Sequence, residues 1–237
     1  MANPPPSTAK GLIGGDLETR ARLSRVPPVD HPLVLAPYRK DGDEALTRAF
    51  LDHHPLHVEI GFGRPHHPID LARLLPEAHV LGFEIKRQWV RAAAERAARE
   101  GLANLRVIEG DARPHIERLV TPGTVDAIHI LFPDPWWKKR HHKRRVFNAD
   151  FVALLVACLA PGGMLIAKTD VEAYADELVA ELGQAGLALA GSGTADATLA
   201  SLPRSHREKK CEELGIPVFR FRFVLSAPPT SPGAPSA

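Results

Sequence analysis

The stretch Leu56-His-Val-Glu-Ile-Gly-Phe-Gly63 is a short apolar run that ends in two closely spaced glycines. This is the form of a buried strand that runs into a tight turn. Outward from it, further apolar runs alternate with segments of helical spacing. Strands are expected at 79–85, 104–111 and 125–135, the last running into a loop, and helices at 69–75, 87–101 and 112–120. This alternation predicts a mostly parallel sheet with helices on both faces.

The second half of the chain continues the pattern. Residues 161–170 predict a turn and a strand, residues 187–193 another strand, and helices are expected at 149–159 and 171–186. The run VFRFRFV at 218–224 alternates apolar and charged residues, as an antiparallel edge strand with one wetter face does. We therefore expect a Rossmann-like α/β fold with a mostly parallel seven-stranded sheet and an antiparallel edge strand.

Composition bounds the class of protein. Of the 237 residues, 44% are hydrophobic and 24% charged, which is ordinary for a globular protein. The net charge of +2 means that any contact with nucleic acid must come from a local patch. The Pro-rich segment 1–45 and the tail 227–237 are expected to be flexible, with HPLVLAPY (31–38) docking on a domain at 46–226.

The same totals bear on compartment and partners. The first residues lack the basic start and apolar run of a signal peptide, and no segment approaches membrane-spanning length. Cys158 and Cys211 lie too far apart in sequence to suggest a zinc site or a disulfide framework. These features favour a cytoplasmic protein without a membrane partner. A monomer or homodimer is expected, although the sequence does not decide between them.

The ends of three expected strands carry acidic groups that suit an adenosyl ligand. Gly61 and Gly63, after Glu59, let the backbone turn tightly and approach a ligand. Glu84, 21 residues after Gly63, is placed to accept the hydroxyls of a ribose, and Asp111 to accept from an adenine amine. Each has a plainer alternative: a simple turn, a solvated charge and a helix N-cap, respectively.

The turn after Gly63 departs from a dinucleotide-binding pattern, because Pro65 and Pro68 remove two amide donors from the start of the helix. This argues against a nicotinamide-dependent oxidoreductase. It also motivates a different alternative: an RNA-binding relative with weak or lost cofactor binding.

Residues 131–145, Leu-Phe-Pro-Asp-Pro-Trp-Trp-Lys-Lys-Arg-His-His-Lys-Arg-Arg, directly follow the fourth expected strand. Prolines stiffen the loop around Asp134, Trp136 and Trp137 offer faces for base stacking, and the cations offer phosphate contacts. Read alone, the charge run fits a solvated face or a targeting signal, and each tryptophan a packing residue. Cations expected to contact an RNA backbone are Lys139, Arg140, Lys143, Arg144 and Arg145.

From about residue 56 to 225 the chain resembles the tRNA (guanine-N7)-methyltransferases of the bacterial single-subunit type. The most specific piece is Phe132-Pro-Asp-Pro-Trp136 with the basic run 138–145. Supporting pieces are Glu59-Ile-Gly-Phe-Gly63, Gly82-Phe-Glu84, Asn104-Leu-Arg-Val, Gly110-Asp111-Ala, Pro161-Gly-Gly and Lys168-Thr-Asp170. The resemblance implies a class I S-adenosylmethionine-dependent methyltransferase that modifies N7 of guanine 46 in the variable loop of tRNA.

The resemblance also implies roles for individual residues. Positions that bind the cofactor are Glu59, Glu84, Asp111 and Asp134; positions that bind the tRNA substrate are Lys138, Asp170 and the signature Ser205-His206-Arg207-Glu208. The chain departs from the family pattern at Pro65, where a third glycine is usual, and at Arg207, where an aromatic residue is usual.

The implied chemistry places few demands on the protein. Guanine N7 carries a lone pair and no proton, so the reaction needs alignment rather than a general base. A fixed carboxylate stabilises the positive charge that passes to the purine, and Asp134, Asp170 and Glu208 are the candidates, with Asp134 as the catalytic one. Glu208 could instead pair with Lys209 or Lys210. The target base must leave its stack. Methylation of another RNA or of a protein stays open.

Twelve histidines raise the question of a metal. No pair has the spacing of a zinc-binding helix, and neighbouring histidines on a strand point to opposite faces. No metal is expected.

Overall fold

The computed structural model describes residues 31–35, 44–135 and 146–225. Its elements, in chain order, are α2 (Glu44–Leu51), β1 (Leu56–Ile60), α3 (His66–Leu74), β2 (His79–Glu84), α4 (Arg87–Arg99), β3 (Leu105–Glu109), α5 (Ala112–Leu119), β4 (Val125–Leu131), α6 (Ala149–Cys158), β5 (Leu159–Thr169), α7 (Glu172–Gln184), β6 (Leu187–Ser192), η2 (Gly193–Ala195), α8 (Ala197–Ser201), α9 (His206–Glu213) and β7 (Phe219–Leu225).

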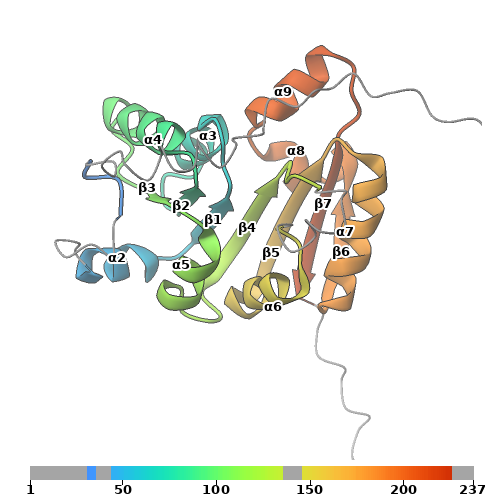
Figure 1. Ribbon diagram of the computed structural model, residues 1–237, viewed down its shortest axis with the longest axis horizontal. Coiled ribbons are helices and arrows are strands. Elements are labelled where there is room, and N and C mark those ends of the chain that lie inside the picture. Colours follow the sequence, from blue (N-terminus) through green and yellow to red (C-terminus); the bar gives the residue numbers. More distant parts are fainter. Residues whose placement is uncertain (1–30, 36–43, 136–145, 226–237) are drawn as a thin grey trace, which may run out of the picture.

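The strands form a seven-stranded sheet in the order β3-β2-β1-β4-β5-β7-β6 (Figure 1). Strands β1 to β5 are parallel to one another, and β7 runs antiparallel to both of its neighbours. The predicted Rossmann-like α/β fold is confirmed. Because chain order reverses between β1 and β4, the topological switch point lies between these two strands, where such sheets bind ligands.

Helices cover both faces of the sheet, as the alternation of strands and helices predicted. On β2, Val80 packs with residues of α3 and α4, whereas the next residue, Leu81, packs in the cluster that holds α5, α6 and α7. Successive strand residues point to opposite faces, so these two neighbours report two separate hydrophobic layers.

The expectation that VFRFRFV is an edge strand is wrong in its position. The strand is antiparallel, but it lies inside the sheet, and β6 forms the edge. Phe223 faces the core and is fully buried, while Arg220 and Arg222 face the segment Gly193–Glu213 and pair with its acids. The charged alternation therefore marks a face covered by a polar segment and not a face open to water.

Part of the N-terminal segment packs on the domain, as expected for HPLVLAPY. Val34 forms a parallel bridge with Val107 of β3, and hydrogen bonds join Leu33 and Leu35 to the same residue. Helix α2, which no periodic pattern predicted, follows at Glu44. None of the helices in the described part of the chain has the length and apolar character that crossing a bilayer requires.

Candidate active site

The carboxyl ends of β1, β2, β4 and β5 meet at one edge of the sheet, because these strands are parallel. Glu59 lies near the end of β1, Glu84 ends β2, and Asp134 and Asp170 follow β4 and β5. The structure therefore brings four of the predicted acidic residues to the same edge, around the switch point.

The predicted glycine turn is closed by Glu84. Gly61 and Gly63 have positive φ values of 70° and 57°, a conformation that favours glycine, and no atom lies within 4 Å of a Cβ built on either. The amide of Gly63 donates to Oε2 of Glu84 over 2.8 Å, and the amide of Lys86 donates to Oε1 over 2.8 Å. Glu84 is buried, so it is not the solvated charge of the plainer alternative.

Asp111 stands at the start of α5, where it caps the helix. Its carboxylate accepts from the amide of Arg113 over 3.0 Å and pairs with the guanidinium of the same residue. The alternative of a helix N-cap is thus what the structure contains. The side chain is exposed, and a cap leaves further acceptor capacity on the carboxylate.

A row of buried histidines lies beside Glu59. His67 Nδ1 is 2.8 Å from Glu59 Oε2, with both side chains at most 2% exposed. His129 of β4, the register partner of Glu59, lies with its ring centroid 5.3 Å from that of His67 and with Nε2 3.2 Å from His57 Nδ1. Burial, with the nearby His67, His57 and Lys168, holds the pKa of His129 well below its usual value of 6.5. Burial also lowers the pKa of His57.

These histidines predict a loss of stability in mild acid. Below pH 6.5 an unfolded histidine gains a proton, while His129 in the folded protein stays neutral, so the unfolded chain binds more protons. The free energy of unfolding should fall with decreasing pH, by up to about 1.4 kcal/mol per pH unit for one such histidine. Urea denaturation between about pH 7.5 and pH 5.5 measures this slope. His129→Leu should make it shallower, and an unchanged slope would contradict the assignment.

The loop after β4 begins with a constrained turn. Phe132 has a φ of 55°, a left-handed conformation that is costly for a residue with a side chain, and its amide donates to the carbonyl of Lys168 over 2.7 Å. Asp134 follows between two prolines and is exposed. The predicted stacking and phosphate-binding residues Trp136, Trp137, Lys138, Lys139, Arg140, Lys143, Arg144 and Arg145 lie outside the described residues.

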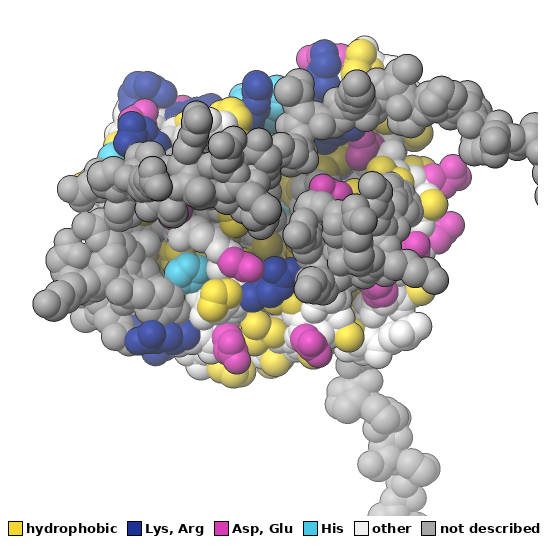
Figure 2. Space-filling model, in the orientation of Figure 1, with side chains coloured by type: hydrophobic (Ala, Val, Ile, Leu, Met, Phe, Trp, Pro, Cys, Tyr) yellow, Lys and Arg dark blue, Asp and Glu magenta, His cyan; other side chains and the backbone are white. Residues whose placement is uncertain are grey.

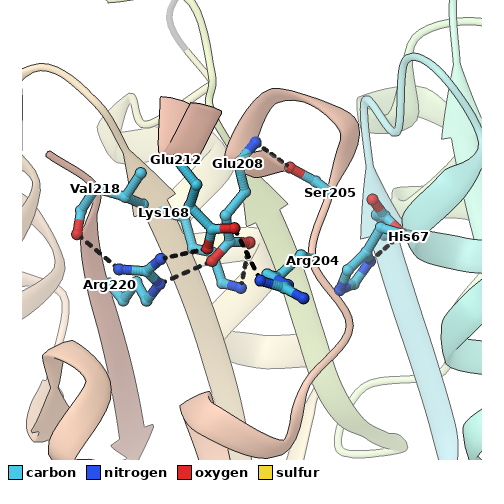
Figure 3. A network of polar contacts seen from close by, with 9 residues as sticks. His67, Lys168, Arg204, Ser205, Glu208, Glu212, Val218 and Arg220 are labelled. Carbon is cyan, nitrogen blue, oxygen red and sulfur yellow. Dashed lines mark hydrogen bonds and ion pairs between the residues drawn. The ribbon is translucent and has the colours of Figure 1, made fainter. Parts of the chain in front are cut away.

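Glu208 of α9 is the centre of a buried ion-pair network (Figure 3). Its carboxylate lies 2.8 Å from Lys168 Nζ of β5 and 2.7 Å from Arg220 Nε of β7, and it is 2% exposed. Lys168 and Arg220 are direct register partners, so the acid separates two cations that would otherwise repel each other across the strands. The alternative pairing with Lys209 or Lys210 is wrong: Lys209 lies near Asp70 and Lys210 pairs with Glu213.

Opposing effects act on the charges of this network. Burial raises the pKa of Glu208, but attraction to Lys168 and hydrogen bonds from Lys168 and Arg220 outweigh it, so the net pKa is lowered. Burial lowers the pKa of Lys168, and Glu208 opposes that shift. Ser205 accepts from the amide of Glu208 over 3.2 Å and caps α9, so the signature fixes the start of this helix.

The other members of the signature face the end of β5 and α3. Arg207 donates from Nε to Asp170 Oδ2 over 3.0 Å and also pairs with it through Nη2, and Asp170 is 13% exposed. The ring of His206 stacks on that of His66, with centroids 5.3 Å apart. The structure thus brings Asp170 into contact with Arg207 of the segment 205–208, and the guanidinium covers the acid.

Comparison with known proteins agrees with this geometry. The profile of a family described as "Putative methyltransferase" matches residues 53–221. A tRNA (guanine-N(7)-)-methyltransferase of Myxococcus xanthus is 39% identical over 174 residues, which cover 73% of this chain and 84% of the relative. The chain belongs to the tRNA (guanine-N7)-methyltransferase family. Its relative of the same description in Anaeromyxobacter dehalogenans is 44% identical over 171 residues, covering 71% of this chain and 85% of that one.

Solved structures support the fold of this family member. The 16S rRNA methyltransferase KamB superposes with a TM-score of 0.58 at 18% identity, covering 81% of this chain and 99% of KamB. At that identity the likeness shows the fold alone.

The sequence alone assigned no role in the site to three residues: His67, Lys168 and Arg220. Two of them left a signal, because a lysine in the otherwise apolar run LIAKT and an arginine in the alternating run FRFRF each call for a buried acid. His67 gave no comparable signal, since its contact with Glu59 depends on how the first turn of α3 packs against β1. No cluster of histidine, cysteine and acidic residues in the described ranges could hold a metal ion.

Proposed function

We propose that the protein transfers the methyl group of S-adenosylmethionine to N7 of a guanine in tRNA, the guanine at position 46 of the variable loop. Relatives described as tRNA (guanine-N(7)-)-methyltransferases match most of the chain at 39 and 44% identity. The observation that carries the proposal is the gathering of Glu59, Glu84, Asp134 and Asp170 at the carboxyl edge of one sheet.

The residues at the switch point fit an adenosyl cofactor. Each carboxylate oxygen of Glu84 accepts one amide and keeps a lone pair, which suits the two hydroxyls of a ribose. The glycine turn leaves open space where a Cβ would stand. In this assignment Glu59 takes the methionyl ammonium group and Asp111 the adenine amine. A cofactor-poor relative is not favoured, because Pro65 and Pro68 are accommodated in the first turn of α3 without loss of the glycine turn.

The loop after β4 and the end of β5 suit an extruded purine. N7 attacks a methyl group carried by a sulfonium, so the protein must align the two and stabilise the positive charge that appears on the purine. We assign Asp134 to the second task. Both contacts of Arg207 reach Oδ2 of Asp170, and we assign the other oxygen of Asp170 to accepting from N1 and N2 of guanine. Because Glu208 is buried between two cations, we assign it to holding α9 rather than to contact with the base.

A tRNA would approach this edge through its phosphates. On the face drawn in Figure 2, Lys and Arg side chains gather toward the edge where α3, α4 and α9 lie. Helix α9 alone contributes Arg207, Lys209 and Lys210, whose side chains are 44–52% exposed. Together with the cations of 138–145 they would supply a local basic patch on a nearly neutral protein. A cytoplasmic monomer or homodimer is the setting we propose for this activity.

Methyl transfer to a tRNA transcript tests the assignment. Labelled S-adenosylmethionine should modify an unmodified transcript, and a transcript with 7-deazaguanine at the target position should accept no label, because it lacks the attacking nitrogen. Equal labelling of the two transcripts would exclude N7 as the acceptor, and labelling of neither would exclude this substrate.

A further inference from the structure

The pair formed by Glu59 and His67 is the most deeply buried polar contact at the cofactor side of the site. The two side chains are at most 2% exposed and lie 2.8 Å apart. An ionised carboxylate at this depth is costly unless donors surround it. The identity of those donors therefore decides how Glu59 is held.

The backbone around Glu59 has few donors to offer. The amides of Gly61 and Phe62 both donate to the carbonyl of Phe83, and the amide of Gly63 is used by Glu84. Pro65 and Pro68, which occupy the first turn of α3, have no amide hydrogen. Within the described residues, the hydrogen-bond donor to the carboxylate of Glu59 is the imidazole of His67.

The ring of His67 is fixed from its other side. His129 lies against it with an interplanar angle of 55°, and His57 in turn holds His129. An ionised carboxylate can only accept, so opposite an ionised Glu59 we assign the proton of the His67 ring to Nδ1. Nε2 is buried and has no hydrogen-bond partner among the described residues. A ring held in this way presents one N–H in one direction, toward Glu59.

One oxygen of Glu59 is therefore committed to His67, and Oε1 has no hydrogen-bond partner among the described residues. We propose that His67 is a positioning residue for cofactor binding: its Nδ1–H holds the carboxylate of Glu59 where that carboxylate accepts from the ammonium group of S-adenosylmethionine. The proposal rests on the function given above. It explains how this chain accommodates two prolines in the turn, since a side chain supplies the donor that the backbone lacks.

Two ligands separate this role from a purely structural one. S-adenosylhomocysteine carries the ammonium group, whereas 5′-methylthioadenosine has the same adenosine and thioether without the amino-acid part. Isothermal titration of the full chain with each gives the dissociation constants. In His67→Phe, which fills the volume but removes the donor, the Kd for S-adenosylhomocysteine should rise about tenfold or more, because a hydrogen bond to a charged group is lost. The Kd for methylthioadenosine should not change.

Two further variants test whether the donor is the Nδ1 atom of His67. His67→Asn places an amide N–H near the position of Nδ1 and should restore most of the affinity for S-adenosylhomocysteine, whereas His67→Gln places it near Nε2 and should not. His53→Asn, at an exposed histidine far from Glu59, serves as the matched control. Thermal denaturation of each variant accompanies the titrations.

The outcomes are distinguishable. The positioning role would be overturned if His67→Phe bound S-adenosylhomocysteine as tightly as the unchanged protein does. It would also be overturned if both ligands bound equally more weakly to His67→Phe and His67→Asn did not restore the affinity. If the unchanged protein bound neither ligand, the proposed function would be overturned, and this inference with it.

Discussion

Replacement of Asp134 by alanine should lower kcat for methyl transfer to tRNA by about 10²–10³-fold while the fold is retained. The charge of the sulfonium passes to the purine during transfer, and a carboxylate held beside the ring is stabilising in the transition state. The turn before Asp134 is anchored by the hydrogen bond from the Phe132 amide to the carbonyl of Lys168, and prolines flank the acid. Exposure of the side chain means that its loss leaves no cavity in the core. Single-turnover transfer of labelled methyl, with circular dichroism on the same samples, measures both expectations.

Two variants make the result specific. Asp134→Asn keeps the shape and removes the charge, so it should lose nearly as much activity as the alanine variant if charge is what matters. Asp52→Ala removes an exposed acid that precedes β1, at the amino edge of the sheet, and should turn over like the unchanged protein. Wild-type turnover by Asp134→Ala would remove Asp134 from the catalytic role.

The parallel half of the fold could be predicted from sequence because its signals are local. Each strand from β1 to β5 is a short apolar run closed by glycine, proline or an acid, and each helix between them has a 3.6-residue period. In a helix such as α4, the spacing of the apolar residues already indicates which side is buried; the buried residues are Val90, Ala93, Ala94 and Ala97. For these elements the observed ends differ from the predicted ends by only a few residues.

The position of β7 could not be predicted in this way. Its alternation indicates that one face is apolar and the other polar, but not what covers the polar face. Here that cover is the segment Gly193–Glu213, whose short helices α8 and α9 have weak periodicity and are held largely by ion pairs to Arg220 and Arg222. The position of β7 in the sheet depends on contacts between segments that are distant in sequence, and a local pattern gives no information about such contacts.

Some residues of the candidate site could likewise be predicted from local sequence, and others could not. Glu59, Glu84 and Asp170 lie at or next to the carboxyl ends of strands, so their convergence could be inferred from the parallel sheet alone. His67 and Lys168 act through partners on other elements, and only the folded arrangement identifies those partners as Glu59 and Glu208. The family signature pointed to Glu208 but not to its burial, which changes its assignment from reading the base to fixing α9.

Glu208→Ala should therefore destabilise the protein by about 3–5 kcal/mol, because it leaves Lys168 and Arg220 buried side by side without their acid. Lys168 is 1% and Arg220 14% exposed, so water cannot easily replace the carboxylate. Urea denaturation at neutral pH measures the change in the free energy of unfolding. Glu213→Ala, on the same helix but in an exposed pair with Lys210, should cost no more than about 0.5 kcal/mol.

A double variant shows whether the cost belongs to the buried charges. Lys168→Met combined with Glu208→Leu removes the closest pair and fills the space with apolar groups, and Glu212, 3.5 Å from Arg220, remains to pair with the arginine. The double variant should be more stable than the sum of its single variants predicts, since Glu208→Leu alone leaves Lys168 buried and unpaired, whereas the double variant removes both charges. Additive losses, or a loss below about 1 kcal/mol in Glu208→Ala, would show that α9 is held by its apolar contacts and cap instead.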